Sequence, residues 1–462
     1  MEQEIEGTPR FGGKHAVVLG GSMAGLITAR VLSEHFARVT VVERDALDDG
    51  SAEPRKGVPQ GRQLHALLKK GETILAELFP DLLPALAADG AVTFDFGGDV
   101  AWHHFGVWKK RFDAGMSTTC LSRPLLESHV RRRVFALPNV RRRDRTEVTT
   151  LVASADRTRI TGAVVKGRDD GDEARLDADL VVDASGRGTR LPGWLSGLGY
   201  APPEETQVKV RVGYASRVFR RVEPSPYPWK SMYLIGKPPD NRRIGALMPQ
   251  EGGQWICVLV GMLGDYPPDD AAGFLEFARG LPVPDLHRVL EELEPVGDIP
   301  THRFSANLRR HYERLERFPE GLVAVGDALA SFNPIFGQGM TTACLDALAL
   351  GACLVEQRGL AGPGDVTGLS RRYHVAAAKL TDAPWMMTTG EDFRYPEVEG
   401  QRPPLYPAMK WYLGQVHRAA SVDTEIFGHF LRAMHMLDGP EKLLAPSTAL
   451  KVLRAARRAS PG

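Results

Sequence analysis

Six residues near the start of the chain, Gly20 to Gly25, read G-G-S-M-A-G and could hold a phosphate group. The dinucleotide fingerprint is G-x-G-x-x-G. Its first glycine makes the turn, its second admits a pyrophosphate and its third packs a helix on a strand. Ser22 stands at the middle position, where its hydroxyl could bond a phosphate oxygen. Glu43 lies 23 residues beyond Gly20, where a carboxylate can accept a hydrogen bond from a ribose hydroxyl. These residues predict dinucleotide binding, and a plain packing turn is the alternative interpretation.

A second motif, Gly326 to Thr341, reads G-D-A-L-A-S-F-N-P-I-F-G-Q-G-M-T and follows the apolar run L-V-A-V. Ligands of open α/β sheets bind at the carboxyl ends of the strands, so Asp327 could accept a hydrogen bond from a ribityl hydroxyl. Gly337 and Gly339 would let backbone N–H groups approach a flat ring at the start of the next helix. Those N–H groups could stabilise negative charge on a reduced flavin ring.

The elements that must position these motifs follow from hydrophobic patterning. Residues His15–Gly21 form an apolar run ending in glycine, residues 23–36 have an apolar helical face, and residues 37–45 form a second apolar run. This order predicts a βαβ unit. Residues 207–299 carry short β-like runs separated by proline and glycine, which is typical of an antiparallel sheet. The remainder, from about residue 365, is expected to be helical.

Composition limits the class of protein. The 462 residues are 43% apolar and 25% charged, which excludes a disordered chain. A net charge of +1 gives no long-range attraction to nucleic acid or acidic membranes. The longest apolar runs, Trp255–Leu263 and Ala347–Val355, are shorter than the roughly 18–20 residues that a bilayer requires, and the acidic N-terminus does not resemble a signal peptide. We therefore expect a cytoplasmic protein with no transmembrane segment that binds no nucleic acid.

The cysteines predict no metal site. None forms a C-x-x-C pair, and no cysteine–histidine cluster has the spacing of zinc ligands. We interpret them as small buried side chains in a reducing compartment. They are Cys120, Cys257, Cys344 and Cys353.

With both glycine motifs in place, residues 14–350 resemble the FAD-dependent monooxygenases built like p-hydroxybenzoate hydroxylase. That family has an N-terminal G-x-G-x-x-G, a glutamate after the second strand and a late G-D-A…P…G-x-G-M/L segment. The resemblance implies FAD binding by residues of both motifs and by Arg123 at an expected helix start. The implied FAD-binding residues are Gly20, Ser22, Gly25, Glu43, Arg44, Arg123, Asp327, Pro334, Gly337, Gly339 and Met340.

Four stretches are most similar to actinobacterial epoxidases of polyether-polyketide biosynthesis. They are Arg55–Gln60, Ser122–Arg123, Asp183–Gly188 and Phe332–Pro334. The resemblance implies an enzyme that uses O₂ to insert one oxygen atom into a lipophilic natural product, by epoxidation of an alkene or by hydroxylation, through a flavin hydroperoxide. The expected substrate is bulky and lipophilic, such as a polyene, a polyketide or an aromatic terpenoid.

Two further positions depart from the family pattern and bear on the reductant. Ser185 stands where the family has the aspartate of a D-G segment, and Ala330 stands where many hydroxylases have histidine. The family links the D-G region to the use of NAD(P)H. The reductant is therefore expected to be NAD(P)H, acting either directly or through a separate flavin reductase.

The implied fold is mixed α/β (α+β mixed). It has a Rossmann-like FAD-binding domain, an inserted antiparallel β-sheet substrate domain and a C-terminal helical region. We predict the FAD-binding domain at residues 1–90, 120–190 and 304–365, and the substrate domain at residues 91–119 and 191–303. The helical region is expected at residues 366–462.

No nucleophile–base–orienter signature stands out, so the catalytic residues are unknown and the chemistry is expected to be carried by the flavin. The expected substrate pocket combines residues of the sheet and of the late loop, with simple core packing as the alternative. The pocket candidates are Met232, Tyr233, Met248, Trp255, Phe332 and Phe336. His65 and the pair His103–His104 could relay protons, although satisfied or exposed histidines are the simpler interpretation.

Other functions remain open on the same residues. A flavin-dependent reductase of prenyl-chain double bonds would conserve both glycine motifs and consume no O₂. A non-catalytic flavin- or ligand-binding protein would also keep them. A flavin-dependent halogenase is disfavoured, because the W-x-W-x-I-P signature of that group is absent from the sequence.

Overall fold

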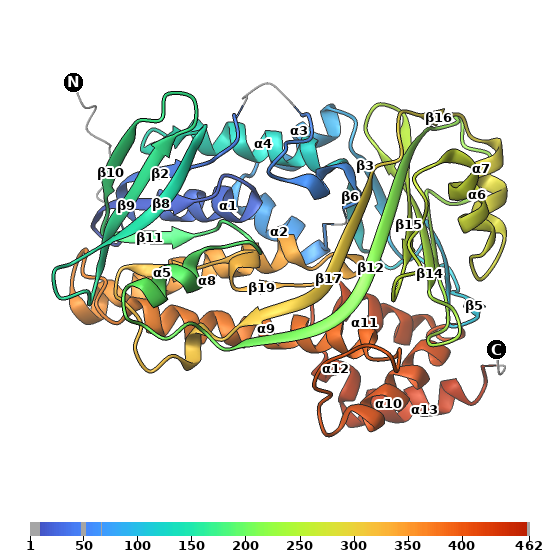
Figure 1. The fold of residues 1–462 in the computed structure, drawn as a ribbon. Coiled ribbons are helices and arrows are strands. Elements are labelled where there is room, and N and C mark those ends of the chain that lie inside the picture. The colour runs from blue at the N-terminus through green and yellow to red at the C-terminus, as the bar shows by residue number, and fades with distance from the viewer. Residues whose placement is uncertain (1–9, 48–51, 66, 460–462) are drawn as a thin grey trace.

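A computed structural model describes residues 10–47, 52–65 and 67–459 of the chain. Within these residues the fold has two large sheets. The first is a five-stranded parallel sheet with strand order β18-β11-β1-β2-β7 (Figure 1). Its strands are β1 (Gly13–Leu19), β2 (Phe36–Val42), β7 (Val140–Arg143), β11 (Leu180–Asp183) and β18 (Leu322–Ala324). The apolar runs predicted on either side of the first glycine motif are β1 and β2, joined by helix α1 (Met23–Leu32).

Side chains alternate between the two faces of this sheet. Val18 and Val41 pack with α1 and with the long helix α8 (Gly339–Ala361), whereas Val17 and Leu19 pack toward a small antiparallel sheet. That sheet consists of β8 (Thr146–Ala153), β9 (Ile160–Gly167) and β10 (Glu173–Asp177). The other helices in the part of the fold around the parallel sheet are α2 (Lys69–Leu78), α3 (Leu82–Ala88), α4 (Arg123–Phe135) and α5 (Leu191–Gly197).

The second large sheet is mostly antiparallel and has the strand order β19-β17-β12-β15-β14-β13-β4-β5. The longest strand, β12, and its neighbour β17 belong to this second sheet and extend from beside the parallel sheet to its far side, as Figure 1 shows. The strands are β4 (Val100–His104), β5 (Val107–Trp108), β12 (Glu205–Arg220), β13 (Ser231–Ile235), β14 (Arg243–Gln250), β15 (Gln254–Gly261), β17 (Thr301–Arg310) and β19 (Ala330–Ser331). A short strand, β16 (Pro295–Val296), pairs with β12, and β3 (Val92–Asp95) pairs with β6 (Ser117–Cys120).

The two faces of the antiparallel sheet meet different partners. Its outer face packs against α6 (Ala271–Arg279) and α7 (Asp285–Glu292). Its inner face packs partly against the C-terminal helices, drawn in red in Figure 1. Beyond α9 (Leu369–Asp392) these are α10 (Tyr406–Ala419), α11 (Thr424–Met434), α12 (Glu441–Leu444) and α13 (Pro446–Ala456). The arrangement confirms the predicted mixed α/β fold with an antiparallel sheet and a C-terminal helical region.

One helix of the described chain, α8, is long and apolar enough to cross a membrane by those two criteria alone. Its buried residues pack against α1 and α9 in the core beside the parallel sheet; they include Cys344, Ala347 and Leu350. Burial inside the protein therefore accounts for its apolar composition.

Candidate functional site

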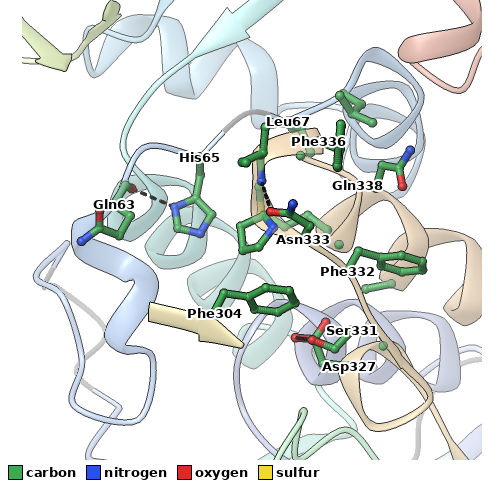
Figure 2. A pocket seen from close by; sticks show the side chains of 18 of the residues that line it. Gln63, His65, Leu67, Phe304, Asp327, Ser331, Phe332, Asn333, Phe336 and Gln338 are labelled. Carbon is green, nitrogen blue, oxygen red and sulfur yellow. Dashed lines mark hydrogen bonds between the residues drawn. The ribbon is translucent and has the colours of Figure 1, made fainter. Parts of the chain in front are cut away.

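A cavity of about 910 Å³ opens where the carboxyl ends of the parallel strands meet the inner face of the antiparallel sheet. Residues directly after β1, β2, β11 and β18 line it, as expected for a ligand site in an open α/β sheet. Strand β19 pairs with β17 and so ties the late motif to the second sheet. Figure 2 shows His65, Phe304, Phe332 and Asn333 around this space, with Asp327 and Ser331 beside one another at its edge.

The first glycine motif forms a tight turn into α1. Gly20 has φ +113°, and a Cβ built there would lie 2.4 Å from the carbonyl oxygen of Ala184. A Cβ on Gly25 would lie 1.8 Å from the carbonyl oxygen of Gly20, so only glycine permits this approach of helix to strand. Gly20 and Ser22 line the cavity, whereas Gly25 lies behind them as a packing residue.

The Ser22 side chain does not cap α1, although Ser22 holds the extended N-cap conformation. Its hydroxyl donates instead to Glu127 Oε2 at 2.9 Å and accepts from Arg123 at 3.0 Å. The first-turn N–H groups of α1, including those of Met23 and Ala24 beside the cavity, therefore lack a side-chain cap. Such a helix N-terminus favours a bound anion.

Glu127 is the centre of a buried ionic network that sequence reasoning missed. Its side chain is 5% exposed and pairs with Arg55 and Arg123. Burial opposes ionisation of Glu127, but Arg123 and Arg55 outweigh it and hold its pKa below its usual range. The sequence feature that indicates this ion pair is the i, i+4 spacing of Arg123 and Glu127 on one predicted helix.

Glu43 occupies the predicted position at the end of β2 and lines the cavity with Arg44. Its Oε2 accepts a hydrogen bond from the backbone N–H of Gly21 at 2.7 Å, and its Oε1 accepts one from the backbone N–H of Asp45 at 3.0 Å. The carboxylate is thereby fixed in direction, and each oxygen keeps a lone pair for a further donor.

The second motif presents Asp327 in a short 3₁₀ turn, η3 (Gly326–Ala328), directly after β18. Gly326 has φ +60° there. Burial raises the pKa of Asp327, while Arg187 and Arg123 oppose that shift. Among the described residues, Ser331 Oγ donates to the Asp327 carboxylate at 3.5 Å, and no other side chain does, so the carboxylate has spare capacity to accept hydrogen bonds.

A second helix N-terminus faces the same cavity. Pro334 lies in the 3₁₀ turn η4 (Pro334–Phe336), Gly337 ends that turn in the left-handed region at φ +65°, and Gly339 begins α8. The side chain of Gln338 makes no cap and accepts instead from Thr388. Pro334, Gly337, Gly339 and Met340 all line the cavity.

The structure places four of the six pocket candidates at the cavity and two away from it. Tyr233, Met248, Phe332 and Phe336 line the cavity. Met232 and Trp255 do not: both pack on the outer face of the sheet, in the cluster with α6 and α7. The physical reason is the two-residue period of a strand, which turns Met232 away from the side that its neighbour Tyr233 faces.

The C-terminal helices also contribute to the cavity wall, which the sequence did not indicate. Tyr412 and His417 come from α10, Phe430 and Met434 from α11, and His435 follows α11 directly. His104 of β4 also lines the cavity and is buried. In the described part of the chain, no group of three or more His, Cys, Asp or Glu side chains could hold a metal ion.

A model of the FAD binding domain family matches residues 14–383. The chain belongs to this FAD-binding family. Protein Rv3254 of Mycobacterium tuberculosis is 36% identical over 442 residues, covering 92% of this chain and 90% of its own. A kynurenine 3-monooxygenase of Salinispora tropica is 26% identical over 417 residues, covering 82% of this chain and 80% of its own.

Solved structures of flavoproteins share the fold. The p-nitrophenol 4-monooxygenase PnpA of Pseudomonas putida superimposes with a TM-score of 0.63 at 19% identity, covering 93% of this chain and 99% of PnpA. The flavin-dependent brominase Bmp2 gives a TM-score of 0.66 at 14% identity, covering 96% of this chain and 99% of Bmp2. At these identities the likeness establishes the fold alone.

The residues of the cavity fit FAD. Two helix N-termini without side-chain caps, a glycine cradle that a Cβ would fill and two carboxylates with free acceptor capacity match a pyrophosphate, a ribose and a ribityl chain. The family membership and this donor set together support FAD as the cofactor.

Proposed function

We propose that the protein is an FAD-dependent monooxygenase that transfers one oxygen atom from O₂ to a bulky lipophilic molecule. The observation that carries the proposal is the single cavity that contains both helix N-termini and then extends along the apolar inner face of the antiparallel sheet. Sequence similarity to a kynurenine 3-monooxygenase supports the same reaction class.

The residues of the first motif would bind the adenosine and pyrophosphate end of FAD. The first-turn N–H groups of α1 would hold the pyrophosphate, and Glu43 would accept from a ribose hydroxyl. Arg123 and Ser22, fixed by Glu127, would form the charged floor under this end, with Arg44 beside it. Gly20 and Gly25 keep the turn and the helix close enough for this arrangement.

The residues of the second motif would orient the ring. Asp327 would accept from the ribityl chain, while Pro334, Gly337, Gly339 and Met340 would place the N-terminus of α8 at the ring edge. When bound and reduced, the flavin activates O₂ for transfer of one oxygen atom. The N–H groups at the start of α8 would stabilise negative charge at that ring edge.

The other residues of the cavity would hold the substrate and exclude water. Phe332, Phe336, Tyr233 and Met248 provide an apolar surface beside the second motif. We propose epoxidation of an alkene or hydroxylation of a natural product, as the resemblance to polyether epoxidases implies. NAD(P)H would supply the electrons, either directly or through a separate reductase in the cytoplasm.

Isotopically labelled dioxygen tests the reaction class. The holoprotein, with a reductant and lipophilic polyenes, polyketides or arenes, is expected to yield a product that carries one labelled oxygen atom, detected by mass spectrometry. A product with two added hydrogen atoms and no label would instead identify a double-bond reductase.

A further inference from the structure

Glu391 is a carboxylate in the cavity wall to which the proposed function gives no role. It lies in the last turn of α9 and lines the cavity together with Met387, one helical turn earlier. Its side chain is 25% exposed. Burial is nevertheless the largest influence on its pKa, whereas for the surface carboxylate Glu399 a hydrogen bond from Lys209 comes first. The accessible part of Glu391 therefore faces the enclosed cavity and not bulk solvent.

One oxygen of this carboxylate is occupied and the other is open to a donor. Oε2 accepts a hydrogen bond from Arg394 Nε at 2.6 Å. Oε1 lies 3.9 Å from His417 Nε2, which is beyond hydrogen-bonding distance, and no other described residue donates to it. Burial opposes ionisation of Glu391, but Arg394 outweighs burial and holds the pKa well below its usual range. An ionised oxygen in a desolvated wall favours a ligand that donates to it.

The next residue, Asp392, places Glu391 beside the second motif. Asp392 accepts from the side-chain amides of Asn307 and Asn333, at 2.7 and 2.8 Å. Asn333 immediately precedes Pro334, in the loop that is expected to hold the flavin ring. Each oxygen of Asp392 is thus engaged by an amide, whereas Glu391 keeps one oxygen for a ligand next to that loop.

The surroundings of Glu391 favour a neutral donor on a lipophilic molecule. Arg394 already pairs with the carboxylate, and the ammonium group of Lys109 is held nearby by a backbone carbonyl of α10. Burial lowers the pKa of Lys109 to about 8, so it is mostly charged at neutral pH. A ligand cation would meet these two positive charges where little water screens them. Met387 and Met409 supply apolar wall beside the carboxylate, so an uncharged O–H group fits better than an ammonium group.

We infer that Glu391 recognises a hydroxyl group on the lipophilic substrate by accepting its hydrogen bond. The inference rests on the proposed function in that the ligand is the substrate of that reaction. A molecule with an ether oxygen in place of the hydroxyl would set two acceptors against each other, and this loss would select against it. Glu391 is thus a specificity-determining residue.

Ligand preference of the oxidised holoprotein tests this directly and requires no turnover. The probes are naphthol and methoxynaphthalene, which share a ring system and an oxygen atom but differ in the O–H donor, and dissociation constants come from equilibrium dialysis. The wild-type protein is expected to prefer naphthol by about tenfold or more. Glu391→Gln can keep its amide oxygen on Arg394 and turn its NH₂ group to the cavity, so the preference should disappear or reverse.

Glu397 offers a matched control. It also pairs with an arginine, Arg242, but its side chain is 46% exposed and forms no part of the cavity wall. Glu397→Gln should leave the preference unchanged. Equal binding of the two probes by the wild-type protein, or binding of neither, would overturn the inference, as would a preference that survives in Glu391→Gln.

Two further measurements complete the test. Tighter binding of aminomethylnaphthalene than of naphthol would overturn the assignment of a neutral donor. If Glu391→Gln does not fold, Glu391→Asp carries the test, because it keeps the charge but withdraws the carboxylate by one carbon atom. The naphthol preference should fall in that variant, and an unchanged preference would contradict the inference.

These experiments separate the inference from the proposed function. A naphthol preference that depends on Glu391, in a protein that transfers no labelled oxygen, would remove the monooxygenase proposal and leave the recognition site. Transfer of labelled oxygen without any naphthol preference would do the reverse.

Discussion

Asp346 of α8 accepts a hydrogen bond from the backbone N–H of Gly326, with a distance of 2.9 Å between Oδ2 and the nitrogen. This contact ties the core helix to the turn that presents Asp327 to the cavity. Asp346 is 3% exposed, and burial, with the like charge of Asp327 adding to it, raises its pKa to about 7. The motif that is expected to hold the flavin is thus supported by a carboxyl group that ionises reluctantly.

Asp346→Asn should make the stability of the protein less dependent on pH. The native pKa of about 7 lies above the ordinary value of 3.8, so the stability that Asp346 contributes is full below about pH 4 and is lost as the pH rises to about 7. The amide oxygen can still accept from Gly326. Between about pH 5 and about pH 8 the variant should gain about 2 to 3 kcal/mol relative to wild type. Urea unfolding at both pH values measures this, and parallel pH profiles would contradict it.

Asp327→Ala should lower FAD occupancy while the chain stays folded. The variant leaves the ribityl donor without the half-buried Asp327 acceptor, a loss of about 1 to 3 kcal/mol, or roughly 5- to 150-fold in the dissociation constant for FAD. The ratio of visible to ultraviolet absorbance gives the occupancy, and circular dichroism checks the fold. Asp327→Asn keeps an acceptor oxygen and should lose less. Full yellow occupancy in Asp327→Ala would refute the role of Asp327.

Gly25→Ala should separate α1 from β1 and weaken both stability and FAD binding. The new Cβ would lie 1.8 Å from the carbonyl oxygen of Gly20. The backbone must shift to relieve this clash, at a cost of about 3 kcal/mol in stability. Gly359 is a matched helical glycine with open space around its Cβ position. Gly359→Ala should stabilise the protein by about 0.5 to 1 kcal/mol. Similar thermal midpoints for the two variants would be inconsistent with the close packing described.

Glu127→Ala should destabilise the fold by about 3 kcal/mol, because it leaves the buried guanidinium group of Arg123 without its carboxylate. Arg55 also loses its contact with Glu127 and keeps those with Asp45 and Glu43. Glu34 provides the comparison, since it also pairs with an arginine four residues earlier, Arg30, but is 33% exposed. Glu34→Ala should cost less than about 1 kcal/mol. Denaturant titrations measure both, and equal losses would argue against a structural role for the buried network.

Local motifs could be predicted from the sequence, and long-range packing could not. The turn at Gly20 and the turn at Gly326 depend on residues next to them in the chain, so their patterns were visible. The two-residue period of the strand was visible as well, and it places the neighbours Met232 and Tyr233 on opposite faces of the sheet. Whether Met232 or Tyr233 points into the cavity depends on α6 and α7, because these helices cover the other side of the sheet.

The C-terminal wall shows the same limit more clearly. His435 and His417 carry no motif, and their place in the cavity arises from helices that pack against β4 and β13 after hundreds of intervening residues. His435 Nδ1 accepts a hydrogen bond from the backbone N–H of Lys69, a contact that no local pattern in the sequence indicates. The predicted division into three domains and the precise substrate stay predictions.

The measurement that tests the central proposal most directly is the reaction of the reduced holoprotein with O₂. The protein is purified, its visible spectrum recorded, reduced under anaerobic conditions and mixed rapidly with aerated buffer. We predict a yellow protein whose reoxidation passes through a transient absorbance that belongs to neither reduced nor oxidised flavin. The Asp327→Ala variant should show this transient only in proportion to the FAD that it still binds. Reoxidation in one step without that transient would contradict the monooxygenase proposal, and a colourless protein that cannot be reconstituted with FAD would contradict the cofactor assignment itself.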